Sequence, residues 1–181
     1  MLWPSGRYNL RNVIDWRARV MDYRDFELDE DYLMNDNPFV STIEKVKCQL
    51  AGMDTMYGTG GDDPESTLDA IWYAAKRSDW GSNSHKIIIV FTDAPTKTVN
   101  EKTLNDIRFA SDDLDVLAQE LCVNQINLFL FGPKDSMYDS LKKVPRAEIV
   151  QFESDPFEFY WNLNLSLIVN RIKLISPYFQ S

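Results

Sequence analysis

The chain has few of the residues that build redox, nitrogen-ligand or nucleophile sites. It contains two cysteines, Cys48 and Cys122, and a single histidine, His85. Two cysteines far apart in the sequence form neither a disulfide framework nor a clustered metal site, and we expect both to be buried thiols in a reducing compartment. With no second histidine, a histidine-based metal site and a serine-histidine hydrolase are disfavoured. The sequence therefore gives little reason to expect covalent catalysis.

Long apolar runs and an excess of positive charge are also missing. The N-terminus lacks a basic start followed by an apolar run, and no stretch is long enough to span a bilayer. Nineteen basic residues against 28 acidic ones give a net charge of -9, which opposes approach to phosphate backbones and anionic membranes. We therefore expect a cytoplasmic protein whose partner is neither nucleic acid nor membrane.

The composition is that of one ordinary domain. The 181 residues are 44% apolar and 26% charged, which is enough to bury one core, so we expect a single domain over 1–181. A β-branched run at 86–93 predicts a strand covered on both faces, and a second strand is predicted at 126–131. Weaker strand patterns occupy 16–23 and 148–151.

Segments with helical period alternate with these strands. A capping box at Ser41 predicts a helix that starts near Thr42. Another helix is predicted to follow Asp63 as its cap, with Glu65 in the first turn. Further helical patterns cover 104–121 and the C-terminal region 155–181, which we expect to pack on the sheet. This alternation predicts an α/β fold, with a Rossmann-like open, mostly parallel sheet flanked by helices on both faces.

Acidic residues follow several of these elements where an open parallel sheet binds ligands, beyond the carboxyl ends of its strands. Asp93 follows the apolar strand, Asp25 follows the segment 16–23, and Asp62 and Glu65 belong to a glycine-rich turn. Carboxylates suit Mg²⁺, Mn²⁺ or Ca²⁺. Taken singly, Glu65 is better explained as part of a helix start, and Asp93 is equally consistent with a turn that ends the strand. Together they favour a metal site.

Two of these segments resemble a known family. Residues 60–65 with 68–71, and then 87–94, resemble the second and third metal-site segments of von Willebrand factor type A domains. The likeness is closest to the subgroup with a Pro-Glu in this turn, which includes integrin β-subunit I-like domains and many bacterial intracellular members. Residues 16–26 and 37–40 are also similar to the bacterial members.

The resemblance implies a binding role and no enzyme activity. Glu65 would be a metal ligand, and Asp93 would contact the ion directly or through water. Asp62 matches an acidic position of a neighbouring cation site, and Asp25 would approach from the adjoining loop. The family's metal-ion-dependent adhesion site leaves one coordination position for an acidic side chain of a partner protein. The implied function is therefore protein-protein interaction through Mg²⁺, Mn²⁺ or Ca²⁺.

One part of the family's pattern is missing. Members begin with a central apolar strand that ends in Asp-x-Ser-x-Ser, followed by a helix, and this chain contains no such motif. Residues 9–15 resemble the tail of that helix, so we expect the first central strand and most of the first helix to be absent. Three explanations stay open: an N-terminally truncated piece of a longer protein, a separate chain that supplies the strand, or a metal-free variant whose neighbouring strands close up.

Two other functions compete with this interpretation. The first is a degenerate, metal-independent von Willebrand type A scaffold that docks by its helices or by the segment after Asp155. The second is a Mg²⁺-dependent phosphotransfer or hydrolytic enzyme built from Asp93, Asp62 and Glu65. The enzyme has less support, because no nucleophile with a paired base is evident.

Overall fold

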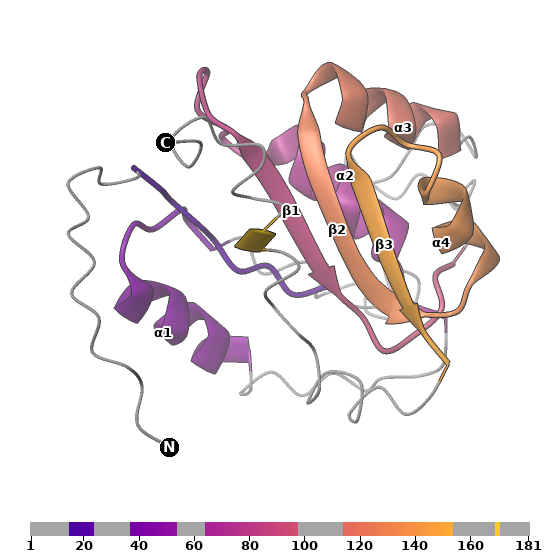
Figure 1. Cartoon of the computed structure of the whole chain (residues 1–181). Helices are drawn as coiled ribbons and strands as arrows, with labels where there is room; N and C mark the ends of the chain where they lie inside the picture. Colours follow the sequence, from indigo (N-terminus) through magenta and orange to yellow (C-terminus); the bar gives the residue numbers. More distant parts are fainter. Residues whose placement is uncertain (1–14, 24–36, 54–63, 98–113, 154–168, 171–181) are drawn as a thin grey trace.

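A three-stranded parallel sheet is the centre of the structure, a computed structural model that describes residues 15–23, 37–53, 64–97, 114–153 and 169–170. The strands lie side by side in the order β1-β2-β3 (Figure 1). Their bounds are Lys86–Phe91 for β1, Ile126–Pro133 for β2 and Ala147–Phe152 for β3. The predicted strands at 86–93, 126–131 and 148–151 are thus confirmed, and so is an α/β fold with an open parallel sheet.

One face of this sheet carries the core. The parallel register pairs Ile88 with Leu128 and Val90 with Leu130, so these four side chains share a face. They pack with residues of α2 (Thr67–Arg77), α3 (Leu114–Val123) and α4 (Ser136–Leu141) in one buried cluster. The helical members of this cluster are Leu68, Ile71, Ala75, Leu117, Leu121, Tyr138 and Leu141.

The opposite face of the sheet is apolar as well. The register places Ile89 and Phe91 of β1 beside Phe129 and Phe131 of β2, and the Phe91 and Phe131 rings stack with centroids 5.3 Å apart. Phe129 and Phe131 are buried, whereas Ile89 is 42% exposed and Phe91 is 49% exposed. The predicted C-terminal helix that would pack on the sheet lies outside the described residues, except for residues 169–170, which are helical.

Helix α1 (Ile43–Met53) begins where the sequence predicts, but its cap is one residue further along. The Thr42 Oγ1 accepts a hydrogen bond from the Lys45 N–H at 3.4 Å, so Thr42 replaces the predicted Ser41 as the capping side chain. No residue of α1 is fully buried, and the apolar Ile43 and Leu50 are both more than half exposed. None of the described helices is long and apolar enough to cross a membrane.

The predicted strand at 16–23 does not form as such. An antiparallel bridge joins Ala18 to Val40, with two backbone hydrogen bonds of 2.8 Å, and Tyr23 is a second isolated bridge residue. This segment and α1 lie on the side of β1 away from β2 (Figure 1). Within the described part of the chain, β2 is the strand that pairs with β1, so β1 borders the described sheet.

Arginine side chains hold the segment 15–23 against the end of α2. The Arg17 guanidinium donates to the Asp79 carbonyl oxygen, and that of Arg19 donates to the Ser78 Oγ at 2.8 Å. Both guanidinium groups lie over the Phe39 ring, at 4.5 Å and 5.3 Å from its centroid. The charged side chains of this segment thus make contacts with the end of α2 and with Phe39. Among the described residues, the segment does not pair along its length with another strand, so the strand predicted at 16–23 is wrong.

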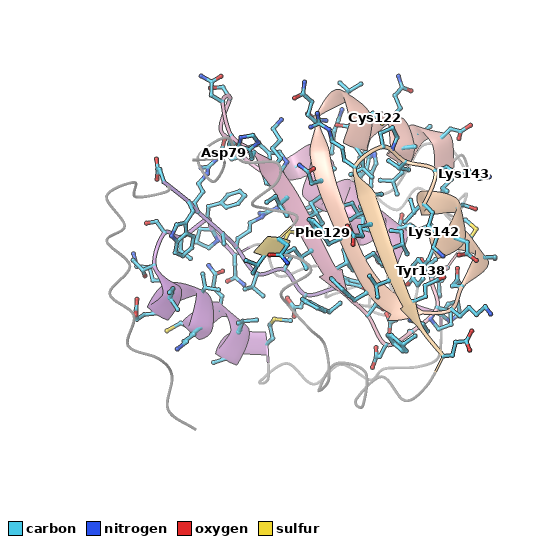
Figure 2. The ribbon with its side chains drawn as sticks, viewed as in Figure 1. Asp79, Cys122, Phe129, Tyr138, Lys142 and Lys143 are labelled. Carbon is cyan, nitrogen blue, oxygen red and sulfur yellow. The ribbon has the colours of Figure 1, made fainter. Side chains whose placement is uncertain are left out.

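Both cysteines are exposed, so the prediction of buried thiols is wrong. Cys122 lies at the end of α3 (Figure 2), one position after the buried Leu121. Because adjacent residues of a helix point about 100° apart, the position next to a core residue can face solvent. Cys48 belongs to α1, none of whose residues is fully buried.

Substitution of Leu121 by alanine tests the assignment of the core. Leu121 is fully buried in α3, and we expect Leu121→Ala to lower the free energy of unfolding by about 2 to 5 kcal/mol. Val123 ends the same helix and is 72% exposed, so Val123→Ala should change stability by less than about 0.5 kcal/mol. Urea denaturation measures both, and equal effects would contradict this core.

Candidate functional site

Glu65 pairs with the loop that follows β1. Its N–H donates to the Pro95 carbonyl at 2.9 Å, and its carbonyl accepts from the Lys97 N–H at 2.8 Å, which makes a parallel bridge opposite Thr96. A residue whose backbone groups are used in an extended pairing cannot also belong to a helical turn. The prediction that Glu65 lies in the first turn of a helix is therefore wrong, and α2 begins two residues later, at Thr67.

The loop after β1 also caps the start of α2. Ser66 occupies the capping position but makes no side-chain cap hydrogen bond. The Leu68 N–H instead donates to the Thr96 Oγ1 at 3.4 Å. A helix leaves its first N–H groups without intrahelical partners, and a hydroxyl from another segment here satisfies one of them. The turn before α2 and the loop after β1 are therefore joined by backbone and by side chain.

Asp93 is presented to solvent between two buried residues. It follows Thr92, whose N–H donates to the Phe131 carbonyl at 3.0 Å and so extends the pairing with β2. The Thr92 Oγ1 accepts from the Ala94 N–H at 3.4 Å, which tightens the turn. Thr92 and Ala94 are buried, whereas Asp93 is exposed. The backbone on either side of the Asp93 carboxylate is thus fixed at the carboxyl end of β1.

A network of buried hydroxyl groups lies beneath this edge. The Thr67 Oγ1 is 3.0 Å from the Tyr23 hydroxyl and 3.0 Å from the Tyr138 hydroxyl. The Tyr138 hydroxyl also donates to the Ala94 carbonyl oxygen at 3.0 Å. Tyr138 lies on α4 beside the sheet (Figure 2), and both Thr67 and Tyr138 are fully buried. Four segments that are distant in sequence therefore meet at Thr67 and Ala94.

Burial raises the pKa of both phenols. The pKa of Tyr23 is raised from 10.0 to about 12, chiefly by burial; hydrogen bonds with the Thr67 and Thr92 hydroxyls act to lower it, and the negative charges of Glu65 and Asp93 act to raise it. The pKa of Tyr138 is also raised, first by burial and then by the neighbouring Tyr23. Both groups therefore act as neutral hydrogen-bond donors at neutral pH. The charges of Glu65 and Asp93 both act on one hydroxyl, that of Tyr23.

Two of the four predicted metal ligands lie at this edge of the sheet. The bridge to Thr96 places Glu65 beside the loop that begins at Asp93, and one carboxylate oxygen of Glu65, Oε2, is buried. Asp62 and Asp25 lie outside the described residues. Among the residues that the structure describes, no three histidine, cysteine, aspartate or glutamate side chains gather as a metal-binding group. Two carboxylates are oxygen donors of the type that a hydrated Mg²⁺ or Mn²⁺ accepts, because Mg²⁺ keeps several of its waters.

The hydroxyl network was not predicted from the sequence. Tyr138 is 71 residues from Thr67 and Tyr23 is 44 residues from it, so no local spacing connects them. A signal for α4 exists, because Asp135 caps it by accepting from the N–H groups of Met137 and Tyr138. The helix is only six residues long, which leaves too short a pattern for periodicity to indicate that Tyr138 faces the core.

Comparison with known proteins adds no relative. A scan against protein-family models and a search of curated proteins both give no match to this chain. Membership of the von Willebrand factor type A family is therefore part of the proposal below.

The raised pKa of Tyr23 predicts a loss of stability in alkali. Below pH 10 the folded and unfolded states both keep this proton, so the full stability is present. Between pH 10 and 12 the unfolded state loses the proton first, and the free energy of unfolding should fall by about 1.4 kcal/mol per pH unit for this group. Tyr23→Phe should remove this contribution to the slope, as measured by urea denaturation at a series of alkaline pH values.

Leu121→Ala provides the control for that measurement. It changes no titrating group, so it should lower the stability by the same amount at each pH. An alkaline slope in Tyr23→Phe equal to that of the wild-type chain would show that the Tyr23 phenol titrates alike in both states.

Proposed function

We propose that this protein is an interaction module of the von Willebrand factor type A kind. Glu65 and Asp93 would hold a divalent cation, Mg²⁺ or Mn²⁺, beyond the carboxyl end of β1. The bound cation would offer a coordination position to an acidic side chain of a protein partner. The activity is binding, and no covalent bond is made or broken.

The observation that carries this proposal is the pairing of Glu65 with the loop after β1. Backbone hydrogen bonds of 2.9 Å and 2.8 Å hold Glu65 outside α2 and against residues 95–97. The ordinary explanation of an acid before a helix, that it occupies the first turn, does not account for this position. The backbone of Glu65 is thus held against the loop that follows Asp93, at the carboxyl end of a parallel strand, which is where such sheets bind ligands.

The electrostatics of the edge favour a cation. The charges of Glu65 and Asp93 both disfavour ionisation of the Tyr23 hydroxyl, so the two carboxylates contribute negative potential to the same region. Like charges at one edge of the sheet repel each other, and a divalent cation relieves that repulsion. The neutral phenols beneath can orient the loops without adding charge of their own.

The missing Asp-x-Ser-x-Ser motif defines what a partner chain would add. In the family that this chain resembles, that motif ends a strand beside the counterpart of β1 and supplies the remaining direct metal ligands. The described sheet borders on β1, with α1 and the segment 15–23 on its far side (Figure 1). A second chain that adds a strand at this border would bring its hydroxyls and carboxylate to the same end as Asp93, since parallel strands share their carboxyl ends.

The first test measures stabilisation by Mn²⁺. We expect Mn²⁺ to raise the free energy of unfolding of the whole chain, by about 2.7 kcal/mol at a concentration of about 100 times Kd. Glu65→Gln and Asp93→Asn should abolish most of this increase. Glu44→Gln is the matched control, because Glu44 is exposed in the first turn of α1, outside the site. Thermal denaturation with and without chelator gives the comparison.

Different outcomes select the competing functions. Unchanged Mn²⁺ stabilisation in both site variants would contradict the assignment of Glu65 and Asp93. Partner binding that survives chelator would favour the metal-independent scaffold. Metal-dependent turnover of a phosphoester, lost in Asp93→Asn, would favour the enzyme.

A second test supplies the missing ligands in trans. A synthetic apolar peptide ending in Asp-x-Ser-x-Ser should bind the chain more tightly with Mn²⁺ present, and should increase the affinity for Mn²⁺, because the two ligand sets then complete one shell. A peptide ending in Asn-x-Ala-x-Ala is the control. Equal Mn²⁺ affinities with the two peptides, measured by calorimetry, would contradict the role of the motif.

A further inference from the structure

Tyr138 connects α4 to both loops of the candidate metal site. Its hydroxyl lies 3.0 Å from the Thr67 Oγ1, at the start of α2, and 3.0 Å from the Ala94 carbonyl oxygen, in the loop after β1. Thr67 is two residues from Glu65, and Ala94 is adjacent to Asp93. One side chain therefore contacts the Thr67 side chain, two residues from Glu65, and the Ala94 backbone, next to Asp93.

We propose that Tyr138 is a positioning residue for cation binding at Glu65 and Asp93, acting through Thr67 and Ala94. This inference rests on the proposed function, and it assigns a role to a residue that the resemblance does not include. Its support is the geometry of buried contacts among α4, α2 and the loop after β1.

The number of available protons gives the network a direction. Tyr138 has one hydroxyl proton, and the Ala94 carbonyl can only accept. When Tyr138 donates to Ala94, the contact between Tyr138 and Thr67 requires the Thr67 hydroxyl to donate to Tyr138. Thr67 then accepts from the Tyr23 hydroxyl, 3.0 Å away. Tyr23 thus donates to Thr67, Thr67 to Tyr138, and Tyr138 to the Ala94 carbonyl beside Asp93. Each of the three contacts then has one proton.

A glycine makes room for the Tyr138 ring. A Cβ atom added at Gly132, near the end of β2, would lie 3.2 Å from the Tyr138 Cε2 and 2.8 Å from the Thr92 Cγ2. The bare backbone at Gly132 therefore allows the ring and the Thr92 methyl group to approach the end of the sheet together. This close approach is a second, independent sign that the position of the Tyr138 ring is fixed.

The cap of α4 fixes the other end of the side chain. Asp135 Oδ1 accepts from the Tyr138 N–H at 3.3 Å and from the Met137 N–H at 2.7 Å. Tyr138 is thus held at its backbone by the helix start and at its hydroxyl by two segments of the site. A fully buried, doubly anchored phenol can fix the distance between the two loops, which sets the separation of their carboxylates.

The experiment compares hydroxyl deletions on the whole chain, with Mn²⁺ as the probe. Tyr138→Phe keeps the ring and removes the hydroxyl, and we expect about 10-fold weaker Mn²⁺ binding. Tyr73→Phe, a half-buried position of α2 outside the network, is the matched control and should bind Mn²⁺ like the wild type. Thr67→Val should reproduce the loss, whereas Thr67→Ser keeps a hydroxyl and should restore affinity.

Hydrogen exchange provides a readout that needs no metal. The amides of Glu65 and Lys97 form the bridge between the two loops, and the Leu128 amide bonds to Arg146 in the sheet, away from them. In Tyr138→Phe we expect faster exchange at Glu65 and Lys97, with exchange at Leu128 unchanged. This pattern separates loosening of the site from general loss of stability.

The outcomes distinguish the two proposals. If the wild-type chain binds no Mn²⁺ but Tyr138→Phe accelerates exchange at Glu65 and Lys97, the fixing of the loops by Tyr138 is supported, and cation binding by this chain is overturned. If the wild type binds Mn²⁺ and Tyr138→Phe changes neither affinity nor exchange, the positioning role is overturned while the proposed function survives. If Tyr138→Phe does not fold, the threonine pair decides, and equal affinities for Thr67→Val and Thr67→Ser overturn the positioning role.

Discussion

The arrangement of the candidate site depends on the parallel bridge between Glu65 and the loop after β1. This bridge removes Glu65 from α2, delays the start of that helix to Thr67 and brings Thr96 to the helix N-terminus as its cap. Because β1 is fixed by its register with β2, the loop that receives Glu65 is fixed as well. The carboxyl end of β1 and the amino end of α2 are therefore held together. Asp93 follows the first of these segments and Glu65 precedes the second.

The hydroxyl groups that connect the segments of the site are neutral, and its two candidate ligands are charged. The phenols and threonine hydroxyls are buried and hydrogen-bonded, while Asp93 is exposed and Glu65 is partly buried. Burial of uncharged hydroxyls costs little once they are paired, whereas burial of paired carboxylates without a cation is costly. The negative charge of the site therefore lies near solvent, on Asp93 and Glu65, and the hydroxyl groups add none.

The sequence predicts the sheet better than it predicts the site. The apolar runs at 86–93 and 126–131 were sufficient to place β1 and β2, because apolar runs of this length are typical of strands in a parallel sheet. The bridge at Glu65 was missed, since the same Asp-Pro-Glu pattern is typical of a helix start and tertiary pairing overrides that local preference. Tyr138 was missed because its role depends on contacts with residues far away in sequence. The C-terminal helix, Asp62 and Asp25 stay predictions.

The way in which the segment 15–23 is attached has a consequence for local opening. A strand inside a ladder leaves only when the sheet breaks, but the contacts of this segment are isolated bridges and side-chain contacts, among them the bridge at Ala18, the arginines around the Phe39 ring and the Tyr23 hydroxyl. Side-chain contacts of this kind can be released as a local unit, without unfolding the sheet. Detachment would separate the Tyr23 hydroxyl from Thr67 and leave that threonine hydroxyl open to water, so the packing of the N-terminal segment also protects the hydroxyl network of the site.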